Sequence, residues 1–242
     1  MTIRHNLLDM DATELAEKIA SRDISSLEAT NTYIEHLEKI NPDINCLVEN
    51  RYFKAKYEAK ETDEKLEKGE SGGKLFGVPI SMKESFDVAG MKTTGGLPYR
   101  KYMVEEQDAE IVGRLKEEGA IILGKTNTPV LCYCQETDNK LFGLSKNPWD
   151  ITRTTGGSSG GEAALIAAGG AAVGIGADVG GSIRFPSHFN GVVGFKSGDN
   201  QVSQTGSFPP MGHPLQKQMF GIGAIAKSVR DARMINEILA YE

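Results

Sequence analysis

The sequence predicts an α/β fold, and three segments in its middle carry this prediction. Residues 75–90 begin as a short apolar strand, residues 105–118 have a helical pattern, and the apolar run at 120–127 indicates a second buried strand. A strand, a helix and a strand in this order are typical of α/β proteins. The chain of 242 residues is long enough for one large domain or two small ones with a substantial core.

The N-terminal part, residues 1–70, is expected to be helical. Asp11, with Glu14 three residues later, is typical of a capping box at the start of a helix. Ser26 is expected to cap a second helix, which should end before Pro42 because proline interrupts helices. These patterns predict helices at 12–23, 27–40 and 52–68, with a short strand at 45–48.

The second half of the chain has shorter elements. Residues 129–150 and 198–222 lack a clear period and are expected to be irregular. Ser228 is expected to cap a last helix that continues to the end of the sequence. Between the two irregular parts, the pattern predicts a helix at 161–168, strands at 172–177 and 192–195, and a turn at 178–186.

A glycine-rich stretch at 155–197 has the local chemistry of a nucleophile site. Ser158, Ser159 and Ser182 lie beside glycine pairs, so they have little steric cover and have backbone N–H groups next to them. An exposed serine beside free N–H groups suits nucleophilic catalysis with an oxyanion hole. A flexible linker is the alternative, but the glycines alternate with Ala, Leu, Ile and Val runs that are expected to be buried.

Composition argues against several other classes of protein. The net charge of −6 argues against a nucleic-acid partner bound through phosphate neutralisation. No run of about 18 apolar residues is present, so no membrane-spanning helix is expected. Cys46, Cys132 and Cys134 are too few for a disulfide framework, which favours the reducing cytoplasm. The sequence contains no phosphate-binding loop and no clear set of metal ligands, so we expect no cofactor and no metal.

A serine nucleophile needs a base, and lysine is a better candidate here than histidine. A lysine can accept a proton when burial lowers its pKa. Lys83 follows an apolar strand and should lie beside the core, and Lys125 is a weaker candidate of the same kind. A structural role is the alternative for both lysines. Of the four histidines, His5 and His36 are expected at the surface, His188 is poorly placed relative to Ser182, and His213 stays open.

Six motifs together resemble those of the amidase signature family. They occur in the order of the family, at 77–84, 124–127, 147–150, 156–161, 176–184 and 191–196. The segments GGSSGGEAALI and GGSIRFPS look most like the fatty acid amide hydrolase branch. The resemblance implies a mixed central β-sheet flanked by helices. It also implies one domain over 1–242, with N-terminal helices (1–70), a catalytic core (75–197) and a closing part (198–242), and without the family's usual C-terminal continuation.

The resemblance also implies a role for each residue of the signature. Ser182 matches the nucleophile, Lys83 the base, and Ser158 the bridging serine that follows a cis peptide and relays the proton. The backbone N–H groups of Val179, Gly180, Gly181 and Ser182 match the oxyanion hole, and Ser159, Asp178 and Arg184 match the supporting polar residues. The expected reaction is hydrolysis of a linear carboxamide, a small molecule, through an acyl-enzyme on Ser182.

Two alternatives stay open at this point. One is a glutamyl or aspartyl-tRNA amidotransferase A-type subunit, although Glu162 replaces a serine that this type usually has and residues 195–199 depart from its pattern. The other is a truncated domain without catalytic activity. An incomplete sheet would favour a homo-oligomer or a completing partner chain. The apolar segment 207–211 favours aliphatic or aryl amides. Cys132 and Cys134 are expected to be buried on the same face of a strand, and the alternative is that they line the substrate pocket.

Overall fold

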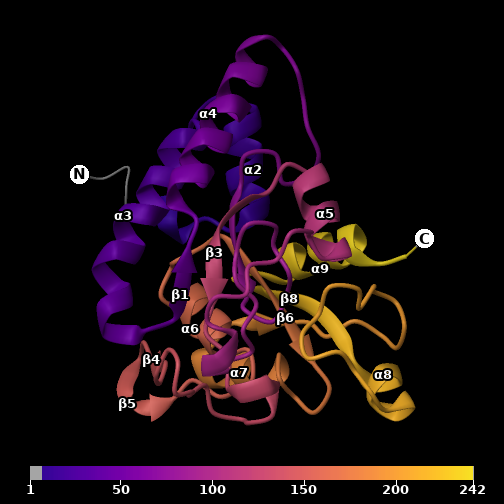
Figure 1. The fold of residues 1–242 in the computed structure, drawn as a ribbon. Helices are drawn as coiled ribbons and strands as arrows, with labels where there is room; N and C mark the ends of the chain where they lie inside the picture. Colours follow the sequence, from indigo (N-terminus) through magenta and orange to yellow (C-terminus); the bar gives the residue numbers. More distant parts are fainter. Residues whose placement is uncertain (1–6, 242) are drawn as a thin grey trace.

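A computed structural model describes residues 7–241 and has a six-stranded mixed sheet at its centre, with helices around it (Figure 1). The strand order is β1-β3-β2-β6-β8-β7. The strand β2 is parallel to both β3 and β6, whereas β1, β8 and β7 are antiparallel to the strands they pair with. The strands are β1 (Leu47–Asn50), β2 (Pro79–Lys83), β3 (Ile121–Thr126), β6 (Val173–Asp178), β7 (Val193–Gly194) and β8 (Gly221–Ala226). The predicted α/β fold with a mixed sheet is confirmed.

The helices cover the sheet in groups. Helices α3 and α4 pack against each other beside β3, and Figure 1 shows them running side by side away from the sheet. Helix α6 packs on β2 and β6, and α9 packs on β8 and contacts both α5 and α2. The helices are α2 (Ala12–Ala20), α3 (Ser26–Ile44), α4 (Tyr52–Glu67), α5 (Glu110–Glu117), α6 (Gly160–Ala167), α7 (Arg184–Asn190), α8 (Pro214–Met219) and α9 (Val229–Leu239). No helix within residues 7–241 is both long and apolar enough to cross a membrane.

Polar contacts join the start of α2 to α9. Asp11 caps α2 as expected, since its Oδ1 accepts a hydrogen bond from the Glu14 N–H at 2.9 Å. The same carboxylate pairs with the Arg230 guanidinium of α9 at 2.5 Å. Asp231 is buried and accepts hydrogen bonds from the backbone N–H groups of Ala12 and Thr13, at 2.7 and 2.9 Å. These contacts hold residues about 220 positions apart in one compact unit.

The boundaries of α3 differ from the prediction at both ends. Ser25, rather than Ser26, is the N-cap, because its hydroxyl accepts the Glu28 N–H at 2.9 Å. The helix continues past Pro42 to Ile44. A proline in the last turn removes only one N–H donor, and the Asn45 N–H still bonds to the Asn41 carbonyl at 2.8 Å. The short strand expected at 45–48 lies at Leu47–Asn50.

The segments predicted as irregular contain regular elements. The segment 198–222 includes α8 and the start of β8, and β8 pairs with β6 along the whole length of both strands. The segment 129–150 includes β4 (Lys146–Asn147), which forms a hairpin with β5 (Asp150–Thr154), and the turn at 178–186 leads into α7. These elements are short or glycine-rich and form through contacts with distant segments, so the local pattern does not reveal them.

Candidate active site

The residues of the signature meet at the carboxyl ends of the parallel strands. Lys83 is the last residue of β2, and Asp178 is the last residue of β6, with Ser182 four residues further on. Ser158 lies two residues before the start of α6. Ligands of sheets with parallel strands commonly bind beyond these carboxyl ends. The topology therefore places three separate segments of the chain at one ligand-accessible edge.

Lys83 and Ser158 are in direct contact. The Lys83 Nζ donates a hydrogen bond to the Ser158 Oγ at 2.6 Å, and both side chains are almost completely buried. Burial lowers the pKa of Lys83 because removing the ammonium from water disfavours its charged form, and the nearby Cys132, Asp178 and Glu162 oppose this only in part. The peptide bond between Gly157 and Ser158 is cis, as the resemblance implies. The lysine therefore has the surroundings that a proton acceptor needs.

Ser182 faces the same cavity as this pair. Lys83, Ser158 and Ser182 all line one cavity of about 520 Å³, and Ser182 is half-buried. The Ser159 N–H donates to the Ser182 carbonyl at 3.0 Å, which ties the two serine-bearing turns together. Within residues 7–241, no hydrogen bond joins the hydroxyls of Ser158 and Ser182. The structure thus brings the two serines to one cavity without a direct bond between their hydroxyls.

Three of the four predicted oxyanion donors are free of protein acceptors. The amides of Val179, Gly180 and Ser182 donate to no acceptor among residues 7–241. The Gly181 N–H instead donates to the Asp178 Oδ1 at 2.7 Å. Because the Gly181 N–H already donates this hydrogen bond to Asp178, it is not free to bind a ligand. The turn therefore offers the amides at 179, 180 and 182 to a ligand.

Asp178 organises this turn. Its carboxylate also accepts the Ile183 N–H at 3.0 Å and two bonds from the Arg184 guanidinium, at 2.9 and 3.0 Å. Burial alone would raise the pKa of Asp178, but the hydrogen bonds from Arg184 and the backbone amides outweigh it and lower the pKa to about 2. Ser159 supports the other side, where its hydroxyl donates to the Ala177 carbonyl at 3.3 Å.

Replacing Asp178 with asparagine should destabilise the protein by about 1–2 kcal/mol at neutral pH. The pKa of Asp178 falls from 3.8 to about 2 on folding. The carboxylate therefore contributes stability above pH 3.8 that is lost as the pH falls through about 2. The Arg184 side chain is about half exposed, so solvent screens part of this stabilisation. Urea unfolding of both proteins at several pH values measures the difference, which should shrink towards pH 2.

The matched control for this prediction is Asp150→Asn. Asp150 also accepts hydrogen bonds from its own turn and pairs with Arg153, but it lies on an exposed hairpin. Its replacement should cost less stability than that of Asp178. Equal losses in the two variants would contradict a special role of Asp178 in holding the turn.

The cavity has one wall that is mostly apolar. The segment 207–212 forms part of this wall through Phe208, Pro209 and Met211. Leu131 and Phe220 are also among the apolar residues of the lining. Cys132 and Cys134 also line the cavity, which confirms the alternative for these cysteines, whereas the expectation that they are buried on a strand is wrong. They lie in and after the 3₁₀ turn Val130–Cys132, where the left-handed backbone of Leu131 and Cys132 directs the chain around the cavity.

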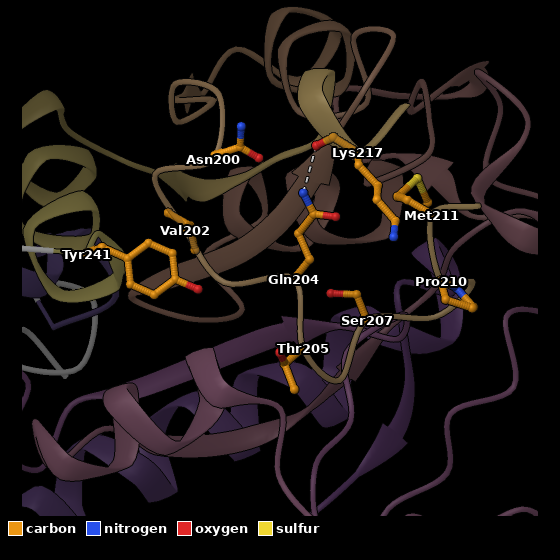
Figure 2. A pocket seen from close by; sticks show the side chains of 9 residues that line it. All are labelled: Asn200, Val202, Gln204, Thr205, Ser207, Pro210, Met211, Lys217 and Tyr241. Atoms are coloured by element: carbon orange, nitrogen blue, oxygen red, sulfur yellow. Dashed lines mark hydrogen bonds between the residues drawn. The ribbon is translucent and has the colours of Figure 1, made fainter. Parts of the chain in front are cut away.

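A second cavity of about 430 Å³ adjoins the first and shares Ser207, Pro210 and Met211 with it. Figure 2 shows its walls, which come from the segment 200–217 and from Tyr241 near the end of the described chain. The Gln204 side-chain amide donates to the Lys217 carbonyl at 2.8 Å and closes one side of this cavity. None of the predicted site residues lines it.

The other candidate residues lie elsewhere. Lys125 is buried, but its Nζ donates to the Lys92 carbonyl and to the Thr93 hydroxyl, so it holds a loop and does not line the cavity. Within residues 7–241, no three His, Cys, Asp or Glu side chains are grouped so that they could hold a metal ion. His36 bonds to the Ala168 carbonyl, His188 is exposed beside Phe189, His213 accepts the Leu215 N–H, and His5 lies outside the described residues.

Sequence reasoning missed the surroundings of Glu162. This side chain is fully buried and accepts hydrogen bonds from the hydroxyls of Ser81 and Thr126, the second at 2.6 Å. Burial raises the pKa of Glu162 to about 7. The sequence does contain an indication, since Glu162 is a carboxylate among small apolar residues. A charged side chain in such a run is seldom fully buried unless other groups pair with it.

Comparison with known proteins finds relatives along nearly the whole chain. The profile of the family described as Amidase matches residues 28–241. Fatty-acid amide hydrolase 2-B of Danio rerio is 41% identical over 98% of this chain and 46% of its own length. The A-type subunit of glutamyl-tRNA(Gln) amidotransferase from Carboxydothermus hydrogenoformans is 37% identical over 96% of this chain and 47% of its own length. The chain thus spans about half the length of these relatives.

Solved structures agree with these sequence matches. A fatty acid amide hydrolase superposes with a TM-score of 0.91 at 29% identity, over 98% of this chain and 42% of that one. A bacterial aryl acylamidase superposes with a TM-score of 0.88 at 32% identity, over 96% of this chain and 48% of that one.

Proposed function

The chain belongs to the amidase family, and from this premise we propose that it hydrolyses a linear carboxamide through an acyl-enzyme on Ser182. The observation that carries the proposal is the 2.6 Å bond between the Lys83 Nζ and the Ser158 Oγ, in the cavity that Ser182 also lines. Burial lowers the pKa of Lys83 and therefore favours its neutral amine, the form that can accept a proton. Lys83, Ser158 and Ser182 all line this cavity, so Ser158 can pass the proton between the lysine and the nucleophile.

The first step forms the acyl-enzyme. The Ser182 Oγ attacks the carbonyl carbon while its proton moves to Ser158, and Ser158 gives its own proton to Lys83. The amides of Val179, Gly180 and Ser182 are the free donors of the turn, and they stabilise the negative charge that develops on the carbonyl oxygen. The C–N bond then breaks, and the proton held by Lys83 returns through Ser158 to the leaving amine.

The second step uses water. A water molecule takes the place of the amine, gives a proton to the Ser158–Lys83 pair and attacks the ester carbon. The bond to the Ser182 oxygen breaks, the carboxylic acid leaves, and Ser182 recovers its proton. The chain supplies every proton carrier in this sequence, so no step needs a metal or an organic cofactor.

We propose a substrate whose acyl side is apolar. A cavity of about 520 Å³ lies within the size range of sites for small organic ligands. Its wall of Leu131, Phe208, Met211 and Phe220 favours an aliphatic or aryl acyl group over a charged one.

The free thiols at 46, 132 and 134 favour a reducing compartment, for which we propose the cytoplasm.

A fluorophosphonate probe tests this proposal because it reacts with an activated serine. We expect one probe per chain, attached to Ser182 in the mass spectrum, and no labelling of the Ser182→Ala variant. A fast release of amine equivalent to the enzyme concentration should precede steady turnover of an aryl amide. Labelling at a different residue, or none in a folded protein, would refute the proposal and favour a domain without catalysis.

The amidotransferase alternative is tested by its partners. The relative's name makes it one part of a larger amidotransferase, so a chain of that type would copurify with other subunits. It would release ammonia for an ATP-dependent transfer that those partners complete. We expect instead amide turnover by the isolated chain or by a self-associated form. A requirement for a different partner chain before any labelling of Ser182 would favour the alternative.

A further inference from the structure

Glu162 connects the three segments that carry the site. It lies in the first turn of α6, four residues after Ser158, and its side chain is completely buried. One carboxylate oxygen accepts a hydrogen bond from the Ser81 hydroxyl of β2, and the other accepts one from the Thr126 hydroxyl of β3 at 2.6 Å. A single side chain thus joins the helix that follows Ser158 to two adjacent strands.

Both partners of Glu162 lie close to Lys83 in the sheet. Ser81 precedes Lys83 by two residues on β2, so its side chain points to the same face of the sheet. Thr126 is the residue of β3 that pairs with Lys83 in the parallel register. A movement of the Glu162 carboxylate would therefore shift the end of β2 relative to α6, and with it the contact between Lys83 and Ser158.

The sheet has a site of matching shape for this carboxylate. Gly174 of β6 lies beside it, and a Cβ atom at this position would come within 2.0 Å of the Glu162 Oε1. Gly174 also pairs with Ser81, the donor to that oxygen. The missing side chain at 174 is therefore what leaves room for the carboxylate against the sheet.

Two titratable groups among residues 7–241 interact with the charge of Glu162. Lys83 of β2 lowers the pKa of Glu162, and Glu162 raises the pKa of the Cys46 thiol before β1. The pKa of Lys83 is in turn raised by Cys132 of the 3₁₀ turn, by Asp178 at the end of β6 and by Glu162, against the larger effect of burial. An ionised Glu162 stabilises the ammonium form of Lys83, whereas a protonated Glu162 does not, so the two groups titrate as a pair.

We propose that Glu162 is a positioning residue, which holds Lys83 against Ser158 and sets the pH range in which Lys83 accepts a proton. The inference rests on the proposed function, since it concerns the base of that reaction. Glu162 touches neither the substrate cavity nor Ser182, and it acts only through Lys83 and the strand ends.

The decisive variant is Glu162→Gln, which keeps the size of the side chain and removes its charge. The glutamine can accept one hydroxyl proton and donate to the other hydroxyl, so the packing is retained. The rate of Ser182 labelling by a fluorophosphonate should rise with pH as Lys83 becomes neutral. In the variant the half-maximal rate should be reached at lower pH, because the Glu162 of the parent, whose pKa is about 7, ionises as the pH rises and stabilises the ammonium form of Lys83.

A second measurement does not depend on activity. The chemical shift of the Lys83 side-chain carbon next to Nζ, in isotopically labelled protein, follows the ionisation of this lysine directly. We expect its titration at lower pH in Glu162→Gln than in the parent. The control is Glu84→Gln, a buried carboxylate next to Lys83 in sequence that acts on Lys125 instead, and it should leave the Lys83 titration unchanged.

The outcomes separate the two proposals. No labelling of the parent chain would refute the proposed function, while the Lys83 titration would still decide the role of Glu162. Identical Lys83 titrations in the parent and in Glu162→Gln would overturn the inference even if Ser182 reacts. If Glu162→Gln does not fold, Thr126→Val serves in its place. Removing this hydrogen-bond donor destabilises the ionised form of Glu162, so the titration of Lys83 should shift in the same direction.

Discussion

Replacing Lys83 with methionine should lower the rate of Ser182 labelling by about 100- to 10,000-fold, the usual effect of removing a general base. The same change should leave the free energy of unfolding nearly equal, because Glu162, whose pKa is already about 7, can take up a proton once its cation is removed. Lys83 is fully buried and its pKa is lowered, so the folded chain has to hold either a neutral amine or a poorly solvated cation. Methionine has a similar length and no charge to desolvate. Labelling kinetics and urea unfolding at neutral pH measure the two effects.

A second buried lysine provides a control with the opposite pattern. Burial lowers the pKa of Lys227 to about 8, and its Nζ donates to the Met10 carbonyl at 2.9 Å, away from the cavity of Ser182. Lys227→Met should keep the labelling rate and lose stability, because a buried carbonyl loses its donor. A Lys83→Met variant that labels as fast as the parent would contradict the role of Lys83 as the base.

Replacing Lys125 with methionine should destabilise the protein by about 3 kcal/mol, because a carbonyl and a buried hydroxyl lose their donor and the buried Glu84 loses a favourable charge. Lys125 donates to the Lys92 carbonyl and, at 2.8 Å, to the Thr93 hydroxyl, so it fixes a loop above the end of β3. Burial raises the pKa of Glu84, and the charge of Lys125 opposes this shift in part. The loss should grow as the pH rises and Glu84 ionises. Urea unfolding of the parent and the variant at several pH values measures it.

A double-mutant cycle tests this explanation. Glu84→Gln combined with Lys125→Met should be less destabilising than the sum of the single changes, since the uncompensated charge is then absent. Lys116→Met is the control, because Lys116 pairs with Asp108 in a partly exposed position, and its loss should cost about 1 kcal/mol or less. Additive effects of the Glu84 and Lys125 changes would rule out the proposed coupling.

The sequence is most informative where short motifs determine local chemistry. The order of the glycine and serine motifs is sufficient to predict the family and the sheet. Lys83 lies at the end of a strand, as the apolar residues that precede it in the sequence suggest. The cavity also contains the segment 207–212, whose composition already marks it as apolar in the sequence.

The sequence is least informative where a distant contact decides the outcome. The strand β8 forms because β6 presents a complementary edge, and nothing within GIGAIA indicates that partner. The resemblance groups the Gly181 amide with the oxyanion donors, yet it bonds to Asp178 because that side chain reaches back over its own turn. Likewise, Cys132 reaches the cavity through two residues with left-handed backbone, a conformation that the residue types Leu and Cys do not suggest.

The close fit between Glu162 and Gly174 has a consequence for how this sequence can diverge. Any side chain at 174 would displace the carboxylate, so exchanges at 174 are tolerated only together with a smaller residue at 162. Gly174→Ala alone should be harmful, and the same change in a Glu162→Ser background should be much milder, which is strong epistasis between two buried positions. Among homologues, the identities at these two positions should therefore change together.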